Sequence, residues 1–517
     1  MHSLPLLDLA IVLGYLLGMV GVGIYFSRKN SSTAQFTKAS GNIPGWAIGL
    51  SIYATFLSSN TFLGVPGKAF GSNWNSFVFS LSMPLAAWVA TRFFVPFYRS
   101  SGQISAYSHL EARFGSWART YAVVCFLLTQ LSRMGSIFFG IALSLQALTG
   151  FSMQSIMLVI GICIVIYTVL GGMEAVIWTE VAQGIIKTLG ALLILFLLVS
   201  NMPNGIQSIL EIGERDQKFS LGSFAPDFTQ ATFWVTLLYG FFINLNNFGI
   251  DQNYVQRYHT AQNVHDATRS VWLCVWIYVP VSFVFFCIGS SLYAYYMLHP
   301  DAIQGVLQQV AAEKVSASAS AAEVKQVMST LQPSDYGDKV MPHFMVTQIP
   351  TGLVGVIVAA ILSAAMSTIS SGMNASATVF SVDIYQRYFK PQLSDKQSLH
   401  LLYMATTVMG ILGMVTGLAM IGVKSVLDLW WELSGIFAGG MLGLFLLGML
   451  AGQARRFEAA TATTIALLVI LWMAFSDRFP AEFAALKNPF HKNMVMVIGT
   501  LTLFLVGTTL SRFKTKH

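Results

Sequence analysis

The stretch that decides the fold is residues 52–64, which read IYATFLSSNTFLG. It belongs to an apolar run long enough to cross a membrane, yet hydroxyl and amide side chains cluster at its middle, and Gly64, Pro66 and Gly67 follow. Polar groups are costly inside a bilayer, so such a cluster marks a candidate functional site. We predict that the helix is interrupted here and that its freed carbonyls face a cavity. The alternative is that the hydroxyls bond to their own helix or pack against a neighbour.

The composition of the chain indicates an all-α polytopic membrane protein. Of its 517 residues, 55% are hydrophobic and only 10% are charged, and the mean hydropathy is +0.64. A soluble domain has about 25% charged residues. Runs of about 20 apolar residues fit a hydrocarbon core about 30 Å thick. We predict about thirteen spans, at residues 5–27, 43–67, 75–98, 117–148, 154–171, 178–200, 231–253, 271–297, 342–377, 399–421, 426–450, 459–476 and 493–511.

The basic residues predict the orientation in a cell membrane. If the first loop is cytoplasmic, most Lys and Arg of the loops and tail lie on that side, and this bias sets topology. The N-terminus is then outside and the C-terminus cytoplasmic. The net charge of +7 is explained in this way, not by nucleic-acid binding. The basic residues assigned to the cytoplasmic side are Arg28, Lys29, Lys38, Arg99, Arg113, Arg119, Arg257, Arg269, Arg387, Lys390, Lys396, Arg455, Arg456, Arg512, Lys514 and Lys516.

Two long loops, about 201–230 and 298–341, are predicted to lie outside. The second contains an Ala/Ser-rich stretch, Val315–Glu323, that we expect to form a short surface helix or a mobile lid. Neither loop is large enough for a soluble enzyme domain.

A second polar cluster lies in the seventh predicted span, where residues 244–252 read NLNNFGIDQ. Asn and Asp are poor helix formers, so a second interruption is expected here, five spans after the first. Two interrupted helices at corresponding positions of two halves indicate a transporter built on inverted repeats. The alternative is a helix that ends at the membrane surface.

The ninth span carries a stripe of hydroxyls. Ser367, Ser370 and Ser371 share one helix face, and Ser363 lies one turn earlier. Neutral oxygens of this kind suit a hard cation, and sodium in particular. A small-residue packing face is the alternative.

Three of the charged residues inside the predicted spans are candidates for a functional role. Arg133 is deep in the fourth span and requires an anionic partner, which could be Asp251, Glu180 or an anionic substrate. Glu180 and Lys187 are seven residues apart and share a helix face. Glu180 could complete a cation site, lie at the interface or pair with Lys187.

Three segments carry a resemblance to a known family. They are residues 364–371 (AAMSTISS) with Asn374 and 383–385 (DIY), residues 167–173 (YTVLGGM) before 178–180 (WTE), and Gln252 with 255–258 (VQRY). In order and spacing they resemble the sodium/solute symporter family. The resemblance implies a LeuT-type fold of two five-helix inverted repeats, and alternating access coupled to sodium. It divides the chain into a leading helix and first cytoplasmic loop (1–42), a first repeat (43–200), a second repeat with the outer loop 298–341 (201–451), and two C-terminal helices with a tail (452–517).

The resemblance also implies two sodium sites. One sodium would bind the carbonyls of Ala54, Leu57 and Ala364 and the hydroxyls of Ser367 and Thr368. A possible second sodium would bind Glu180, Ser367, Ser370 and Ser371, although the family usually has Asp at the position of Glu180.

Within the family, the region around Phe56, Ser58, Thr61 and Arg133 looks most like the bacterial sialic acid symporters, in which an arginine at the position of Arg133 binds the substrate carboxylate. Phe56 stands where those transporters have Thr, Ser80 where they have Gln, and Asp251 where a neutral residue is common. The predicted substrate-binding residues are therefore Phe56, Ser58, Thr61, Ser80, Arg133 and Asp251.

The predicted function is a sodium-coupled symporter that imports a small solute, most simply a carboxylate-bearing sugar such as sialic acid. A sodium symporter for a neutral sugar or a monocarboxylate, and a proton-coupled transporter of the same fold, stay open. An enzyme is not expected, because a membrane enzyme would need catalytic groups such as paired intramembrane carboxylates or a His/Asp cluster, and the nine histidines are scattered, most of them in or near loops. The expected partners are the solute, Na⁺ and the lipid bilayer, with no nucleic acid and no obligatory protein partner.

Overall fold

The structure is a computed structural model that describes residues 5–27, 32–39, 41–315, 320–423 and 426–513. Its regular structure is helical throughout these residues. The long helices are α1 (Leu6–Ser27), α3 (Gly45–Phe56), α4 (Ser59–Gly71), α9 (Ser116–Thr149), α10 (Met153–Ser200), α12 (Phe233–Ile250), α14 (Val264–Leu298), α17 (Pro333–Gln348), α18 (Leu353–Val379), α20 (Asp395–Ala419), α21 (Val426–Leu450), α22 (Arg456–Phe475) and α23 (Met494–Phe513). The shorter helices are α2 (Thr33–Lys38), α5 (Phe77–Leu81), α6 (Met83–Val89), α7 (Val95–Ser101), α8 (Ser108–Phe114), α11 (Ile206–Arg215), α13 (Gln252–Thr260), α15 (Gln304–Lys314), α16 (Ala321–Thr330) and α19 (Gln386–Tyr388).

Each predicted span has a helical counterpart. Eleven helices of the described residues are long and apolar enough to cross a membrane, and the bent pair α3–α4 forms a twelfth. α10 contains two of the predicted spans, because its backbone leaves the helical conformation at Gly172 (φ 59°, ψ −161°). This region of backbone space is open essentially to glycine alone.

Both predicted helix interruptions are present. α3 ends at Phe56, Leu57 is extended (φ −89°, ψ 90°), and α4 continues at an angle of 56° to α3. α12 ends at Ile250, and Asp251 (φ −74°, ψ 121°) caps the start of α13 through its side chain. Because the last carbonyls of a helix have no partner within it, the end of α3 presents free acceptors in the middle of the protein.

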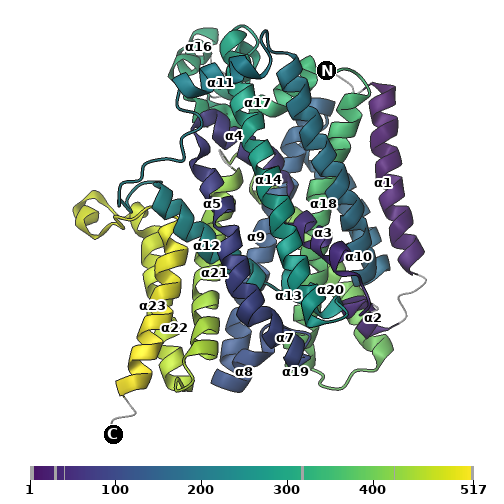
Figure 1. Cartoon of the computed structure of the whole chain (residues 1–517), viewed down its shortest axis with the longest axis vertical. Helices are drawn as coiled ribbons and strands as arrows, with labels where there is room; N and C mark the ends of the chain where they lie inside the picture. Colours follow the sequence, from purple (N-terminus) through teal and green to yellow (C-terminus); the bar gives the residue numbers. More distant parts are fainter. Residues whose placement is uncertain (1–4, 28–31, 40, 316–319, 424–425, 514–517) are drawn as a thin grey trace.

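The helices form one bundle, with a smaller group beside it (Figure 1). α10 packs along α18 and α1, and α14 packs against α3 and α4. α21, α22 and α23 pack on one another, and α21 joins them to the bundle through α9. The breaks in the two interrupted helices, at Leu57 and Asp251, are buried within this bundle.

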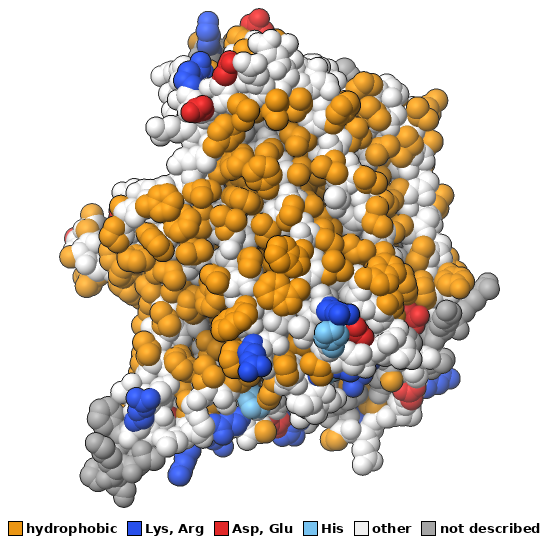
Figure 2. Space-filling model, in the orientation of Figure 1, with side chains coloured by type: hydrophobic (Ala, Val, Ile, Leu, Met, Phe, Trp, Pro, Cys, Tyr) orange, Lys and Arg blue, Asp and Glu red, His pale blue; other side chains and the backbone are white. Residues whose placement is uncertain are grey.

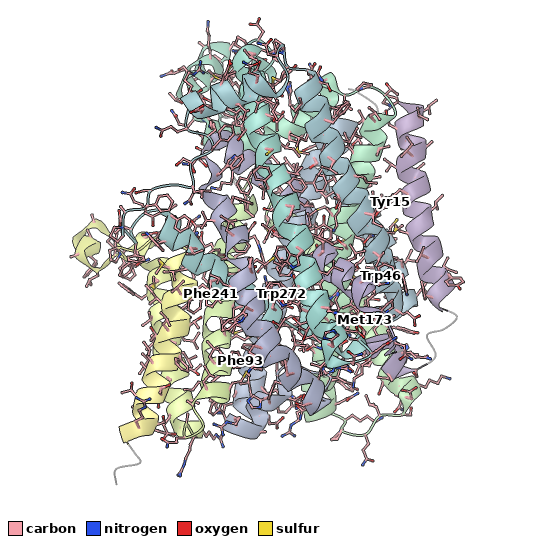
Figure 3. All side chains as sticks on the ribbon, in the orientation of Figure 1. Tyr15, Trp46, Phe93, Met173, Phe241 and Trp272 are labelled. Atoms are coloured by element: carbon pink, nitrogen blue, oxygen red, sulfur yellow. The ribbon has the colours of Figure 1, made fainter. Side chains whose placement is uncertain are left out.

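The surface of the described residues is that of a membrane protein. Figure 2 shows hydrophobic side chains across the middle of the visible face and charged side chains gathered toward its two ends. Trp46 and Phe93 are about half exposed on this belt (Figure 3). On the inner side, Tyr15 of α1 accepts a hydrogen bond from Gln183 of α10 (3.3 Å).

The predicted start of the ninth span, residue 342, is wrong. The span begins at Leu353, because Pro350 and Gly352 (φ 92°) interrupt the chain after α17, which packs against α4. The long loop 298–341 is largely helical, as α15, α16 and the start of α17. Of the stretch Val315–Glu323, residues 316–319 lie outside the described residues, and α16 begins at Ala321.

The assignment of Arg257 to the cytoplasmic edge is also wrong. Its side chain is 1% exposed and lies inside the bundle on α13. Arg28, Lys29, Lys514 and Lys516 lie outside the described residues. α1 begins at one end of the bundle and α23 ends at the other (Figure 1), as an odd number of spans requires.

Candidate substrate cavity and cation region

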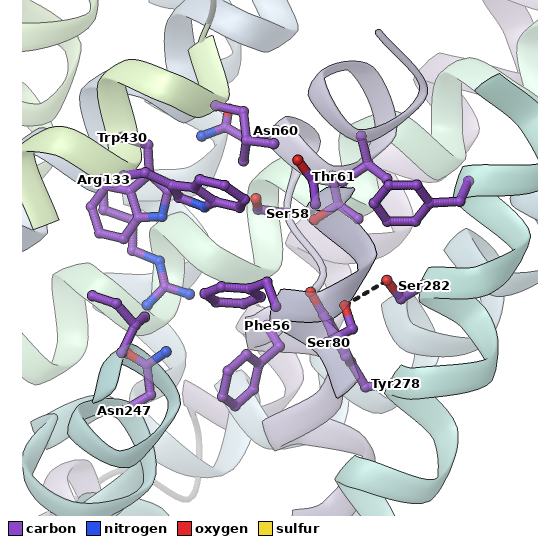
Figure 4. Close-up of a pocket in the computed structure, with 17 residues that line it drawn as sticks. Phe56, Ser58, Asn60, Thr61, Ser80, Arg133, Asn247, Tyr278, Ser282 and Trp430 are labelled. Atoms are coloured by element: carbon purple, nitrogen blue, oxygen red, sulfur yellow. Dashed lines mark hydrogen bonds between the residues drawn. The ribbon is translucent and has the colours of Figure 1, made fainter. Parts of the chain in front are cut away.

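A cavity lies beside the break between α3 and α4 (Figure 4). Five of the six predicted substrate-binding residues line it, and they come from the broken helix, the following span and α9. These five are Phe56, Ser58, Thr61, Ser80 and Arg133. The cavity has further polar and aromatic walls outside the predicted substrate-binding set. They include Asn60 and Asn247, which belong to the two polar clusters of the sequence, and Tyr278, Ser282, Trp430 and Trp431.

Among the described residues, Arg133 donates hydrogen bonds only to neutral groups, and the Asp251 carboxylate interacts with it at longer range, without a hydrogen bond or ion pair. Its guanidinium donates to the carbonyl of Thr55 (2.9 Å) and to the hydroxyl of Tyr254 (3.3 Å). It also lies over the ring of Trp430, 5.7 Å from the ring centroid. The side chain is 7% exposed, so this cation is removed from bulk water.

Asp251 is placed outside the cavity lining. One carboxylate oxygen accepts from the backbone N–H (2.8 Å) and the side-chain amide (2.7 Å) of Asn253. The other accepts a long hydrogen bond from Gln130 (3.4 Å). The carboxylate thus caps α13, which is a structural role in the broken helix.

Aromatic rings form one wall of the cavity. Phe56 packs against Phe248, Tyr254 and Tyr278, with ring centroids 4.7–5.6 Å apart. Beside them, the hydroxyls of Ser80 and Ser282 are hydrogen bonded at 2.7 Å (Figure 4).

The predicted first sodium site is assembled by α3 and α18. The hydroxyl of Ser367 donates to the carbonyls of Ala54 (3.0 Å) and Ala364 (3.3 Å), and that of Thr368 donates to the carbonyls of Thr55 (3.1 Å) and Ala364 (3.3 Å). The five predicted ligands, Ala54, Leu57, Ala364, Ser367 and Thr368, therefore meet around the end of α3.

The ammonium of Lys187 lies among these ligands. It donates to the carbonyl of Ala54 (2.5 Å), the carbonyl of Leu57 (2.8 Å) and the hydroxyl of Ser367 (2.9 Å). Lys187 is fully buried and comes from the second half of α10. As arranged here, the oxygens expected for a first sodium are hydrogen bonded to a cation of the chain.

The predicted second sodium set is divided between two centres. Glu180 is fully buried and pairs with Arg257, which donates to both carboxylate oxygens (2.7 and 2.8 Å). Ser371 donates to Glu180 and accepts from Arg257 (2.6 Å). Ser370 bonds back to the carbonyl of Ser367 (3.2 Å), which itself belongs to the Lys187 centre. The fit for a sodium ion at Glu180 is poor, because a guanidinium already holds both of its oxygens.

Sequence reasoning missed the roles of Lys187 and Arg257. Lys187 was expected only as a possible partner of Glu180, and Arg257 as a surface charge. The signal for Arg257 was its position in the segment 255–258, which carried the family resemblance. For Lys187, the signal was a buried lysine on the same helix face as Glu180.

The fold and the cavity define a class: a secondary transporter with a substrate cavity between two interrupted helices. The comparisons with known proteins agree. The sequence profile of the sodium:solute symporter family matches residues 36–466, and the chain belongs to this family. It is a sodium-coupled symporter by family, with a LeuT-type fold, and it is a multi-pass membrane transporter and not an enzyme.

The chain is similar to two bacterial sialic acid transporters. It is 31% identical to the sodium/sialic acid symporter NanT of Aliivibrio fischeri, over 98% of this chain and 93% of that protein. It is 29% identical to the sodium/sialic acid symporter SiaT of Proteus mirabilis, over 98% of this chain and 95% of that protein. Its fold matches the substrate-bound, outward-open structure of a Na⁺-coupled sialic acid symporter with a TM-score of 0.85, at 28% identity and over 98% of both chains.

Proposed function

We propose that this transporter imports a sugar that bears a carboxylate, such as a sialic acid, and that Arg133 binds the carboxylate. The relatives named above support a sugar acid as the solute class. Ser58, Thr61 and Ser80 are proposed to contact the rest of the solute, and Phe56 to pack against it.

The observation that carries the proposal is that, among the described residues, Arg133 donates hydrogen bonds only to neutral groups, while both candidate internal acids make their hydrogen bonds elsewhere and Asp251 acts on Arg133 only at longer range. Glu180 is paired with Arg257, and Asp251 accepts from Asn253 and Gln130. A buried guanidinium without a carboxylate is costly, and its planar fork fits a carboxylate with two parallel hydrogen bonds. A carboxylate that enters the cavity would supply the missing charge.

Asn60 supports the sugar part of the proposal. Its amide nitrogen donates to the hydroxyl of Ser136 (2.9 Å), and that hydroxyl donates to the carbonyl of Arg133 (2.9 Å), which fixes the orientation of the amide. The amide oxygen of Asn60 is buried and has no hydrogen-bond partner among the described residues. A buried acceptor of this kind is stabilised when a solute hydroxyl donates to it.

The coupling and orientation are proposed as follows. Sodium binding from outside favours the outward-open state, and this difference in affinity lets its gradient drive uptake. The N-terminus is outside and the C-terminus is cytoplasmic. One chain supplies both the cavity and the cation region.

The test is solute binding by purified protein and by Arg133→Gln, measured by thermal stabilisation with N-acetylneuraminate, with a monocarboxylate and with a neutral hexose. We expect N-acetylneuraminate to stabilise the wild type and to lose this effect in Arg133→Gln, because the carboxylate no longer meets a cation. Arg113→Gln is the matched control. Arg113 donates to the backbone carbonyls of Gly448, Ala451 and Gly452, away from the cavity, so this variant should leave binding unchanged.

Stabilisation of the wild type by the neutral hexose alone would contradict the acid specificity. Stabilisation by the monocarboxylate alone would keep the role of Arg133 and reject the sugar. Normal N-acetylneuraminate affinity in Arg133→Gln would make Arg133 structural.

A further inference from the structure

The Lys187 ammonium is a cation in the first predicted sodium site. An ammonium carries three N–H donors, and three oxygens accept from it: the carbonyls of Ala54 and Leu57 and the hydroxyl of Ser367. All of its hydrogen-bonding capacity is therefore used on ligands expected for sodium. No spare donor is left to point elsewhere.

The surroundings explain why a cation is stable there. The carbonyls at the end of α3 carry the negative end of the helix dipole, which favours a positive charge. The nearest carboxylate on the same helix, Glu180, is paired with Arg257 and acts on Lys187 only at a distance, so the direct partners of the ammonium are neutral oxygens. A sodium ion has the same unit charge as the Lys187 ammonium and prefers the same kind of oxygen. Either cation can therefore occupy this place, but both cannot occupy it at the same time.

The lysine is held in this place by its helix. Lys187 and Glu180 lie on the half of α10 that follows the Gly172 break, and Glu180 is anchored through Arg257, Thr55 and Ser371. Tyr53 of α3 is hydrogen bonded to Thr188, the residue next to Lys187. The ammonium is thus tied to the broken helix from two sides.

We propose that Lys187 is a tethered cation that occupies the first sodium site, so that the Lys187 ammonium and sodium exclude one another there. Sodium binding at this site requires the ammonium to leave its three oxygens. This inference concerns the cation region alone and does not depend on which solute the cavity takes.

The test is sodium binding without solute, on purified protein in a potassium background, for Lys187→Met. Met has a similar length and no charge or donor. We expect the sodium concentration at half-saturation to fall by about tenfold or more, because the competing charge-assisted hydrogen bonds are gone. Adding Ser367→Ala to Lys187→Met should remove this gain, because it deletes a ligand of the opened site.

Two variants control the result. Lys218→Met is the matched one: Lys218 also donates to two backbone carbonyls, of Phe70 (2.7 Å) and Ser72 (2.9 Å), but outside the cation region, and its loss should not change sodium binding. Lys187→Gln keeps an amide donor for the carbonyls of α3 without the charge. If Lys187→Met does not fold, Lys187→Gln should show the same gain.

Sodium affinity that is unchanged or weaker than wild type in the folded neutral variants would overturn the proposal. Such a result leaves the acid specificity of Arg133 untouched, and loss of acid binding in Arg133→Gln leaves this inference untouched, so the two failures are distinguishable. Folding of Lys187→Met only when sodium is present would support the proposal, because sodium then replaces the missing cation.

Discussion

The cation region and the substrate cavity lie on the two sides of the same helix break, and they differ in how their polar groups are paired. In the cation region, Lys187 meets three oxygens and Arg257 meets both oxygens of Glu180. In the cavity, Arg133 meets neutral groups, and the amide oxygen of Asn60 has no partner among the described residues. A region whose buried polar groups all have partners within the chain can fold without a ligand. Buried polar groups that lack such partners are stabilised when a ligand binds to them.

The difference follows from where each cation originates. Lys187 and Arg257 are supplied by α10 and α13, which pack against α18 and place their charges at acceptors of α3 and α18. Arg133 comes from α9 and reaches the last carbonyls of α3 from the cavity side. The carbonyls at the end of α3 therefore accept hydrogen bonds from two cations. Lys187 has an acceptor for each of its three donors, whereas Arg133 has no carboxylate bonded to it.

The largest effect is expected from breaking the Glu180–Arg257 pair. Glu180→Gln leaves a buried guanidinium without its carboxylate, which costs about 3–5 kcal/mol. We expect Glu180→Gln and Arg257→Gln each to lower the unfolding temperature strongly and to abolish uptake. The double variant Glu180→Gln/Arg257→Gln, which buries no net charge, should be more stable than either single variant.

The control for this prediction is Glu313→Gln. Glu313, whose side chain is 55% exposed, pairs with Lys339 at the surface, where an ion pair contributes about 0.2–1 kcal/mol. If the losses of stability in the two single variants add up in the double variant, Glu180 and Arg257 act separately. Such a result would contradict the pairing of these two residues in the cation region.

The cation region can also be disturbed from the joint of α10. Gly172→Ala places a Cβ at φ 59° and ψ −161°, a conformation that costs a non-glycine residue about 1–3 kcal/mol. Since Glu180 and Lys187 both follow this joint, we expect lower stability and altered sodium binding, measured by thermal unfolding with and without sodium. Gly14→Ala on α1, where a Cβ meets nothing within 4 Å, should be neutral. Reduced stability with unchanged sodium binding would mean that the joint does not position the cation region.

Much of the fold could be predicted from the sequence because membrane crossing imposes length and apolarity on each span. The breaks near Leu57 and at Asp251 were visible as polar runs inside apolar ones. The start of the ninth span was not, because α17 is apolar enough on one side to extend the pattern, although Pro350 and Gly352 mark the boundary.

The site could be predicted only in part, because residue types do not specify partners. Hydroxyls and carbonyls at the end of α3 were correctly expected to lie together with Ser367 and Thr368. Which cation they hold depends on how far Lys187 reaches across from α10, and this distance arises only when the helices pack. For the same reason, Arg257 could be read as a surface charge.

Arg133→Lys tests how the cation of the substrate cavity binds a carboxylate. Lysine keeps the charge but loses the planar fork that binds a carboxylate through two hydrogen bonds. We expect the affinity for N-acetylneuraminate to fall by about tenfold, or about 1.4 kcal/mol, with sodium binding unchanged. Arg113→Lys serves as the control. An unchanged affinity would mean that Arg133 acts as a point charge and does not read the carboxylate geometry.

The smallest effect is expected from Ser282→Ala, which removes the partner of Ser80. Both side chains are nearly buried and share one hydrogen bond of 2.7 Å, whose net contribution is about 0.5–1.5 kcal/mol. The unfolding temperature should therefore fall only slightly, and the Ser80 hydroxyl becomes available to a solute in the cavity. If Ser80 contacts the solute, Ser80→Ala should weaken binding while Ser282→Ala leaves it unchanged or improves it, as measured by solute-dependent stabilisation of each variant. Equal losses in both variants would assign the serine pair to packing of the cavity wall and remove Ser80 from the substrate-binding set.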